Sequence, residues 1–119
     1  MNKKQYLREY CMTPYGIYSH LKYTSKRRHI ALLFTKEEFK EWYLKQEQKC
    51  YYCKRTLIEI NNDIRERQNV KFRLSLDRID SKKEYSLDNI VLSCYRCNHV
   101  KSEYFTVEEM LKIGKILYL

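Results

Sequence analysis

Two short segments, Cys50-Tyr51-Tyr52-Cys53 and Cys94-Tyr95-Arg96-Cys97, decide how this chain of 119 residues folds. In each segment two residues separate the cysteines, a spacing that lets both sulfurs reach one metal ion from a tight turn. Two such turns supply four thiolates, which complete a tetrahedron around zinc at about 2.3 Å per Zn–S bond. Because no coordination position stays open, the predicted zinc ion is structural. Its predicted ligands are Cys50, Cys53, Cys94 and Cys97.

The remaining cysteine and the N-terminus bear on the compartment. Cys11 fits neither pair, and we expect it to be a buried or idle thiol rather than a metal ligand. The N-terminal lysines precede no apolar segment of the kind found in secretion signals, so we expect a cytoplasmic, reducing environment, in which cysteines bind metal more often than they form disulfides. No run of 18 apolar residues occurs, which excludes a transmembrane helix and gives no reason to expect a membrane partner.

Capping signals and periodicity predict the elements around the cysteines. Thr13-Pro14 predicts a helix over 14–25 with Ile17 and Leu21 on one face. Capping boxes predict further helices over 36–48, which carries Phe39, Trp42 and Tyr43 as an apolar stripe, and over 107–117. Alternation and β-branched residues predict strands over 71–77 and 89–93, and composition predicts a helix over 96–104. The polar residues 60–70 are expected to form an exposed insertion.

These elements predict an α+β fold with a zinc-clamped strand–strand–helix core. The length fits one compact domain with three parts. Residues 1–48 are expected to form a basic helical DNA-binding extension packed on the core, residues 49–104 the zinc-bound core, and residues 105–119 a C-terminal helix. Residues 54–93 are too many for a short zinc ribbon, so we expect zinc to join the helix end near Gln48 to the strand–helix junction near Ser93. In so small a chain this closure is expected to be a main source of stability.

The charge of the chain predicts a polyanionic partner, with DNA as the first candidate. Lys plus Arg number 24 and Asp plus Glu number 15, which gives a formal net charge of +9. Residues 1–34 carry seven of the basic side chains against one acidic side chain. Solubility alone is the alternative explanation for this excess.

The residues between and after the cysteine pairs resemble a known enzyme family. Leu76-Asp77-Arg78-Ile79-Asp80 and Asn89 lie upstream of the second pair, which runs into Asn98 and Lys101. In this order and spacing, the stretch from Cys50 to Lys101 resembles the HNH, or ββα-metal, endonucleases, and looks most like their zinc-stapled branch among phage-type and homing enzymes. The resemblance implies metal-dependent hydrolysis of DNA phosphodiester bonds, by nicking or double-strand cleavage, and a phage or mobile-element origin in a bacterial host.

The resemblance also implies a hard divalent ion, Mg²⁺ or a similar metal, on the scissile phosphate. The family takes its ligands from the end of the first strand and the start of the helix, and Asp77 and Asn98 match those positions. Both offer oxygen, which Mg²⁺ requires, and the ion would stabilise the leaving 3′ oxygen. Asn89 matches the middle Asn, which braces the loop in the family. Lys101 shares a helical face with Asn98 and is expected either to hold a phosphate or to be a solvated surface lysine.

Arg78 departs from the family's pattern, because the residue after the metal-binding Asp is usually the general-base His. A guanidinium cannot accept a proton at physiological pH. Arg78 grips the scissile phosphate while another group or water acts as base, or it pairs structurally with Asp80 or Asp88, or the domain has lost catalysis and only binds DNA. These three interpretations stay open. Candidate substitute bases are His99, His20, His29 and the tyrosines.

Basic side chains in two places are predicted to contact DNA. The first group lies in and after the helix over 14–25, and the second lies in the loop after the first strand. Together the predicted DNA-binding residues are Lys22, Lys26, Arg27, Arg28, His29, Lys82, Lys83 and Lys101. The leading hypothesis is a DNA endonuclease, followed by a catalytically inactive zinc-stapled DNA-binding module and by an RNA-binding or protein-interaction module. The oligomeric state stays open between monomer and homodimer.

Overall fold

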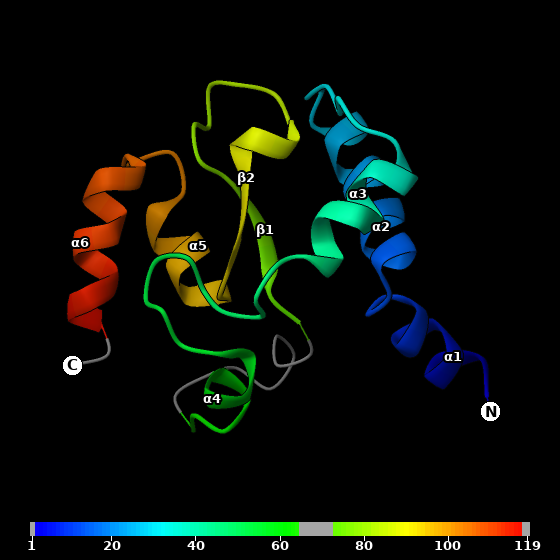
Figure 1. Cartoon of the computed structure of the whole chain (residues 1–119), viewed down its shortest axis with the longest axis horizontal. Coiled ribbons are helices and arrows are strands. Elements are labelled where there is room, and N and C mark those ends of the chain that lie inside the picture. The colour runs from blue at the N-terminus through cyan, green and yellow to red at the C-terminus, as the bar shows by residue number, and fades with distance from the viewer. Residues whose placement is uncertain (1, 65–72, 118–119) are drawn as a thin grey trace. The chain divides into compact units, whose positions relative to one another are not determined.

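The computed structural model describes residues 2–64 and 73–117, and Figure 1 labels its elements. The elements are α1 (Lys3–Tyr10), α2 (Pro14–Arg27), α3 (Lys36–Leu44), α4 (Leu57–Asn61), β1 (Ser75–Arg78), the short 3-10 helix η2 (Leu87–Asn89), β2 (Ile90–Ser93), α5 (Tyr95–Lys101) and α6 (Val107–Leu117). The chain divides into two compact units. The helical unit consists of Met1–Gln46 and Glu84–Asp88, and the strand unit consists of Glu47–Lys83 and Asn89–Leu119.

Helix α2 of the helical unit begins where the sequence predicts. The Thr13 side chain accepts a hydrogen bond from the Gly16 N–H at 3.1 Å, and Pro14 occupies the first helical position. Ile17 is 1% exposed and Leu21 is 6% exposed, which confirms the predicted apolar face. α2 therefore buries one face against this unit's core and leaves its basic face in solvent.

Helix α3 supplies the aromatic centre of the helical unit. The predicted capping box is present, since Thr35 Oγ1 accepts from the Glu38 N–H at 3.1 Å and the Glu38 carboxylate accepts from the Thr35 N–H at 2.9 Å. Phe39 is fully buried. The rings that lie next to Phe39 are those of Tyr18, Phe34, Trp42 and Tyr43. α3 ends at Leu44, earlier than the predicted Gln48, because tight bonds from Lys45 N to Trp42 O and from Gln46 N to Tyr43 O close its last turn.

A short segment from later in the chain completes the helical unit. Tyr85, 5% exposed, donates its backbone N–H to Ala31 O at 3.0 Å and accepts from Leu33 N at 2.9 Å. These two bonds form the bridge between Leu32 and Tyr85. The loop between β1 and β2 therefore contributes residues 84–88 to the helical unit.

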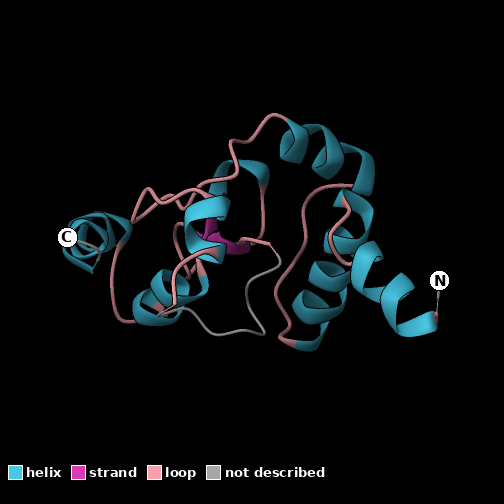
Figure 2. Ribbon diagram, turned by 90° about the horizontal axis from the view of Figure 1, so that it is seen from below, coloured by secondary structure: helices cyan, strands magenta, loops and turns pink. Residues whose placement is uncertain are grey.

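A two-stranded antiparallel sheet lies at the centre of the strand unit (Figure 2). Its register pairs Ser75 with Ser93, Leu76 with Leu92, Asp77 with Val91, and Arg78 with Ile90. Helix α5 follows β2 directly and contacts β1 and α6 (Figure 1). This strand–strand–helix order confirms the predicted α+β fold class.

Two element boundaries differ from the predictions. β1 spans Ser75–Arg78 rather than 71–77, and residues 71–72 lie outside the described part of the chain. α5 spans Tyr95–Lys101 rather than 96–104, because Ser102 has φ of 42° and ψ of −131°, which lies outside the helical region and stops the helix.

Helix α4 corrects the prediction of an exposed polar insertion over 60–70. Thr56 Oγ1 accepts from the Glu59 N–H at 3.2 Å, and the Glu59 carboxylate accepts from the Thr56 N–H at 3.4 Å, which is a third capping box. Ile60, at 3% exposed, is buried, and Asp63 forms an ion pair. Ile60 and Asp63 are thus packed, whereas Asn62 and Ile64 are exposed, as predicted, and residues 65–70 lie outside the described chain.

Helix α6 packs on the first cysteine pair through a glycine. Its N-terminal capping box is the predicted one, with Thr106 accepting from Glu109 N at 3.2 Å, and Met110 is fully buried. At Gly114 an added Cβ would lie 2.4 Å from the backbone oxygen of Tyr52. A side chain at this position would therefore push α6 away from the Cys50–Cys53 turn. Among residues 2–64 and 73–117, no helix is long and apolar enough to cross a membrane.

Gly114→Ala is expected to destabilise the protein. Alanine favours a helix over glycine by about 1 kcal/mol, but the collision is with backbone atoms, and overpacking of this kind costs about 1–3 kcal/mol or more. The midpoint of urea unfolding should fall, whereas Lys112→Ala, at an exposed position of the same helix, should leave it unchanged. An equal or higher midpoint for Gly114→Ala would contradict the close packing of α6.

Candidate functional site

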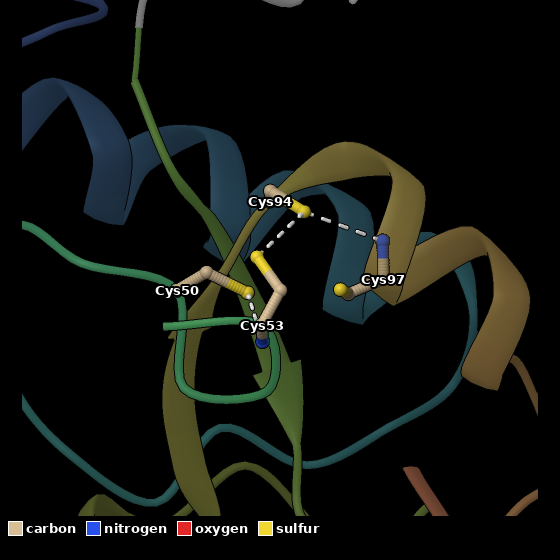
Figure 3. A group of neighbouring side chains, drawn as sticks. All are labelled: Cys50, Cys53, Cys94 and Cys97. Carbon is tan, nitrogen blue, oxygen red and sulfur yellow. Dashed lines mark hydrogen bonds between the residues drawn. The ribbon is translucent and has the colours of Figure 1, made fainter. Parts of the chain in front are cut away.

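The two cysteine pairs meet in the strand unit. The sulfurs of Cys50, Cys53, Cys94 and Cys97 all lie within 4.8 Å of one another, and they point toward a common centre (Figure 3). Cys53 Sγ and Cys94 Sγ are 4.0 Å apart. Ligands of a tetrahedral Zn–S₄ site stand about 3.8 Å from one another, given a Zn–S bond of about 2.3 Å. The donor set therefore fits a structural zinc ion in chemistry and in spacing.

Local hydrogen bonds from backbone N–H groups hold both cysteine turns in shape. In the first turn the Cys53 N–H points at Cys50 Sγ at 3.5 Å, and in the second the Cys97 N–H points at Cys94 Sγ at 3.4 Å. Cys94 is also the N-cap of α5, so the second turn and the helix start are one structure. The Tyr51 N–H donates to Leu92 O at 2.8 Å, which attaches the first turn to β2.

Without a cation the four thiols share protons unequally. Hydrogen bonds from Cys50, then from Cys94 and Cys97, hold the pKa of Cys53 well below its usual range. Contacts with Cys50, then with Cys53 and Cys94, together with burial, raise the pKa of Cys97. Four thiolates this close repel one another, so they ionise together only around a cation.

Asp77, near the end of β1, is a buried carboxylate with two polar partners. It is 8% exposed. The Tyr52 hydroxyl donates to Asp77 Oδ2, and Lys101 Nζ lies 3.3 Å from the same oxygen. Burial raises the pKa of Asp77, and the hydrogen bond from Tyr52 and the charge of Lys101 oppose that rise. Both contacts are made to the same carboxylate oxygen, Oδ2.

Lys101 lies in a different environment from either of those expected for it. It is 1% exposed, and its ammonium donates to Arg78 O at 2.9 Å as well as pairing with Asp77. It therefore holds the end of β1 from α5 rather than projecting from the surface. Asn98 lies three residues earlier in α5, which places it on the same helix face, one turn nearer the helix start. Lys101 is the α5 residue that contacts Asp77, and Asn98 is half-buried one turn before it.

Asn89 and Arg78 hold the two ends of the loop after β1. The Asn89 side chain accepts from Asp80 N at 2.9 Å and donates to Asp80 O at 3.1 Å, which is the bracing geometry that the resemblance implied. Arg78 Nη1 donates to Lys83 O at 2.7 Å. The guanidinium thus lies beside the loop that follows the candidate metal ligand, and its charge adds to those that oppose the rise in the pKa of Asp77 caused by burial.

The candidate bases are distributed over both units. His99 is exposed in α5 and stacks on Tyr95, with ring centroids 5.7 Å apart. Asn98 and His99 are neighbours in a regular helix, so their side chains point about 100° apart. His20 and His29 belong to the helical unit. Burial, and then the hydrogen bond to Asp77, raise the pKa of Tyr52, which keeps that hydroxyl a proton donor.

The predicted DNA-binding side chains are exposed except for Lys101. Five of them belong to the helical unit and two to the loop after β1 in the strand unit. The exposed residues are Lys22, Lys26, Arg27, Arg28, His29, Lys82 and Lys83.

Two residues of the site were missed in the sequence. Tyr52 sits inside the first cysteine pair and contacts Asp77, and Arg55 lies two residues after that pair and contacts its sulfurs. The third Thr-x-x-Glu pattern, at Thr56, marks the start of α4 and was available as a signal for the fold around Arg55. The contact of Tyr52 with Asp77 and the contact of Arg55 with Cys94 each join residues more than 20 positions apart. Local sequence patterns do not reveal such contacts.

Comparison with solved structures shows a close relative. This chain is similar to the rare-cutting HNH restriction endonuclease PacI, an enzyme described as perturbing DNA by an extraordinary mechanism. The similarity covers 84% of this chain and 72% of that chain, with 30% sequence identity and a TM-score of 0.74. No protein-family model and no curated protein sequence matches the chain.

Replacing a cluster cysteine is expected to remove bound zinc. Cys97→Ser should lower the zinc content of the purified protein and reduce its thermal midpoint, because a structural zinc site contributes folding free energy. Cys11→Ser is the matched control, since Cys11 is an exposed free cysteine outside the cluster. Equal zinc content in the two variants, measured by elemental analysis, would contradict the four-cysteine site.

Proposed function

Since the chain belongs to the HNH endonuclease family, we propose that it is a metal-dependent DNA endonuclease that hydrolyses phosphodiester bonds by nicking or double-strand cleavage. One observation carries this proposal. The buried carboxylate of Asp77 stands at the end of β1, facing the helix that carries Asn98, between the two cysteine turns. Lys101 balances the charge of this carboxylate and Tyr52 donates a hydrogen bond to it, and buried carboxylates with charged partners of this kind are concentrated at functional sites.

Asp77 and Asn98 are the proposed ligands of the catalytic divalent ion. Both present oxygen, the ligand atom that Mg²⁺ prefers, and the contacts of Asp77 with Tyr52 and Lys101 are both made by Oδ2. When bound, such an ion supplies charge stabilisation for the leaving oxygen of the phosphodiester. Tyr52, from the first cysteine turn, and Lys101, from α5, hold the Asp77 carboxylate in one orientation. Asn89 braces the loop that follows β1.

Arg78 is the proposed phosphate-binding residue of this site. It follows Asp77 directly, and one of its contacts is a backbone oxygen, Lys83 O, on a flanking loop. A guanidinium presents donors that match two phosphate oxygens and stabilises the charge that develops on them. We assign the proton of the attacking water to His99 or to solvent, because His99 is the histidine of the strand unit.

The exposed basic residues are the proposed contacts to the DNA backbone. Lys22 and Lys26 are four residues apart on α2, and Arg27, Arg28 and His29 follow them. Lys82 and Lys83 belong to the loop after β1. Phosphate contacts of this kind release counterions, so binding should weaken steeply as salt rises.

A DNA-binding module without catalysis is the second candidate function. Arg78 stands where the family usually has its general base, and the Lys101 ammonium already neutralises Asp77. Such a module would retard DNA in a gel-shift assay but would not cleave it with any divalent ion. The nuclease proposal requires cleavage.

The nuclease assay compares wild type with Asp77→Asn and Asn98→Ala in nicking of supercoiled plasmid with Mg²⁺. Each substitution removes a proposed ion ligand, and losing one such stabilising group costs about 10²–10³ in rate. Asn98→Ala is needed because Asp77→Asn leaves the buried ammonium of Lys101 unpaired and destabilises the fold. Glu108→Gln, an exposed carboxylate of α6, is the control. Full activity of both ligand variants would overturn the proposed site.

Substitutions of Arg78 separate phosphate binding from base catalysis. Arg78→Ala should slow cleavage about 10²-fold or more while leaving gel-shift affinity within a few-fold, because the lost charge acts on the reacting phosphate. Arg78→His restores an imidazole at the family's usual base position, and raised activity would show that this site accepts a base. If the Arg78→Ala variant cleaved DNA at the wild-type rate, the role of Arg78 would be limited to its structural contact with the loop after β1.

The salt dependence of DNA binding tests the role of α2. If Lys22 and Lys26 each contact a phosphate, the double substitution to alanine should reduce the slope of log K against log salt by about 1.8 for duplex DNA. A control pair, Lys45→Ala with Lys112→Ala, removes the same charge from other exposed positions. Equal slopes for the two double variants would show that net charge, and not this face of α2, drives binding.

A further inference from the structure

Arg55 is a buried cation beside the cysteine cluster that the proposed nuclease chemistry does not use. It is 8% exposed. Its Nε donates to Cys53 Sγ at 3.4 Å, and its Nη2 donates to Cys94 Sγ at 3.5 Å. Since Cys53 belongs to the first turn and Cys94 to the second, one guanidinium contacts both halves of the cluster.

Asp63 fixes the guanidinium from its other edge. Asp63 Oδ2 accepts from Arg55 Nη1 at 2.9 Å, and the two side chains are 9% and 11% exposed. The guanidinium is a rigid planar fork, so a bond that fixes Nη1 also fixes the directions of Nε and Nη2. The capping box at Thr56 and the buried Ile60 hold α4, and α4 places Asp63 two residues beyond its end.

The backbone between Cys53 and Arg55 turns back on itself, which brings the Arg55 side chain to the cysteine sulfurs. Lys54 has a left-handed conformation with φ of 68°, and its N–H donates to Cys50 O at 3.0 Å. Arg55 O in turn accepts from Cys50 N at 2.9 Å. The chain therefore folds back on the first turn directly after Cys53, and Arg55 is anchored through both its backbone and its side chain.

The charge of a filled site explains why a cation belongs here. Four thiolates around Zn²⁺ carry a formal charge of −2, and Cys50, Cys94 and Cys97 are at most 1% exposed. Negative charge removed from water is costly unless it receives hydrogen bonds and an opposite charge. Charged N–H groups directed at two of the sulfurs supply both, and outer hydrogen bonds of this kind tune metal affinity.

We propose that Arg55 and Asp63 form an outer clamp on the zinc site: Arg55 stabilises the bound thiolates of both turns through N–H···S bonds, and Asp63 positions Arg55. The inference rests on the zinc site of the proposed function. Arg55 and Asp63 are positioning residues, because Arg55 acts on the sulfurs of Cys53 and Cys94 and Asp63 acts through Arg55. Their effect is expected on the retention of zinc, a property that is measured without any cleavage assay.

The test measures how fast the zinc-loaded full-length protein passes its zinc to an excess of a chromogenic chelator. Arg55→Met should accelerate release by about 10–100-fold, the usual effect of losing an outer hydrogen bond at a metal site. Arg55→Lys should restore part of the retention, since an ammonium keeps the charge but does not bridge two sulfurs. Asp63→Asn should accelerate release less than Arg55→Met. In the cobalt-substituted protein, Arg55→Met should also shift the thiolate-to-metal absorption band.

The control is Lys45→Met, which breaks the exposed ion pair with Glu41 and should release zinc at the wild-type rate. Release rates within twofold of wild type for all three clamp variants would overturn the proposal. If Arg55→Met fails to fold, wild-type rates of zinc release in Arg55→Lys and Asp63→Asn overturn the clamp proposal equally. Wild-type protein that binds no zinc would overturn the zinc site together with the clamp, whereas zinc that the variants retain normally overturns the clamp alone.

Discussion

The strand unit depends on the convergence of four cysteine sulfurs from two segments that are far apart in the sequence. Cys50 and Cys53 precede the sheet and Cys94 and Cys97 follow it, so a bond through the sulfurs closes a loop that contains both strands. Each strand has four residues, and an isolated hairpin of this size is marginal in water. The core of so short a chain is also small. An ion bound by all four thiolates adds its binding free energy directly to folding.

The same convergence determines the candidate active site. Cys94 is both a cluster residue and the N-cap of α5, so the cluster fixes where that helix begins, and two turns later Lys101 reaches Asp77. Tyr52 lies between the cysteines of the first turn and donates to the same carboxylate. Both cysteine turns therefore hold Asp77 through one residue each. Two contacts, from Tyr52 and from Lys101, therefore connect Asp77 to the segments that carry the cluster.

Much of the fold could be predicted because its signals are local. The cysteine spacing, the Thr13-Pro14 cap, and the capping boxes at Thr35 and Thr106 act over three or four residues, and the structure has each of them in place. The same signal at Thr56 was overlooked because the polar composition after Ile60 favoured a loop.

The polar contacts inside the strand unit could not be predicted from the sequence. A lysine in the last turn of a short helix is most often solvated, yet Lys101 is buried because α5 packs on β1 and brings it to Asp77. Arg55 and Tyr52 likewise owe their roles to partners that only the folded chain brings near. The residue types at Asp77, Asn89 and Asn98 could be matched to a family pattern, but what holds Asp77 in place could not.

Zinc X-ray absorption spectroscopy on the purified full-length protein tests the account most directly. Four cysteine ligands predict a first coordination shell of four sulfur scatterers at about 2.3 Å and no nitrogen or oxygen. A shell that contains nitrogen or oxygen, or a protein that purifies folded with no zinc, would contradict the claim that the cysteine cluster is the metal site on which the strand unit and its candidate active site depend.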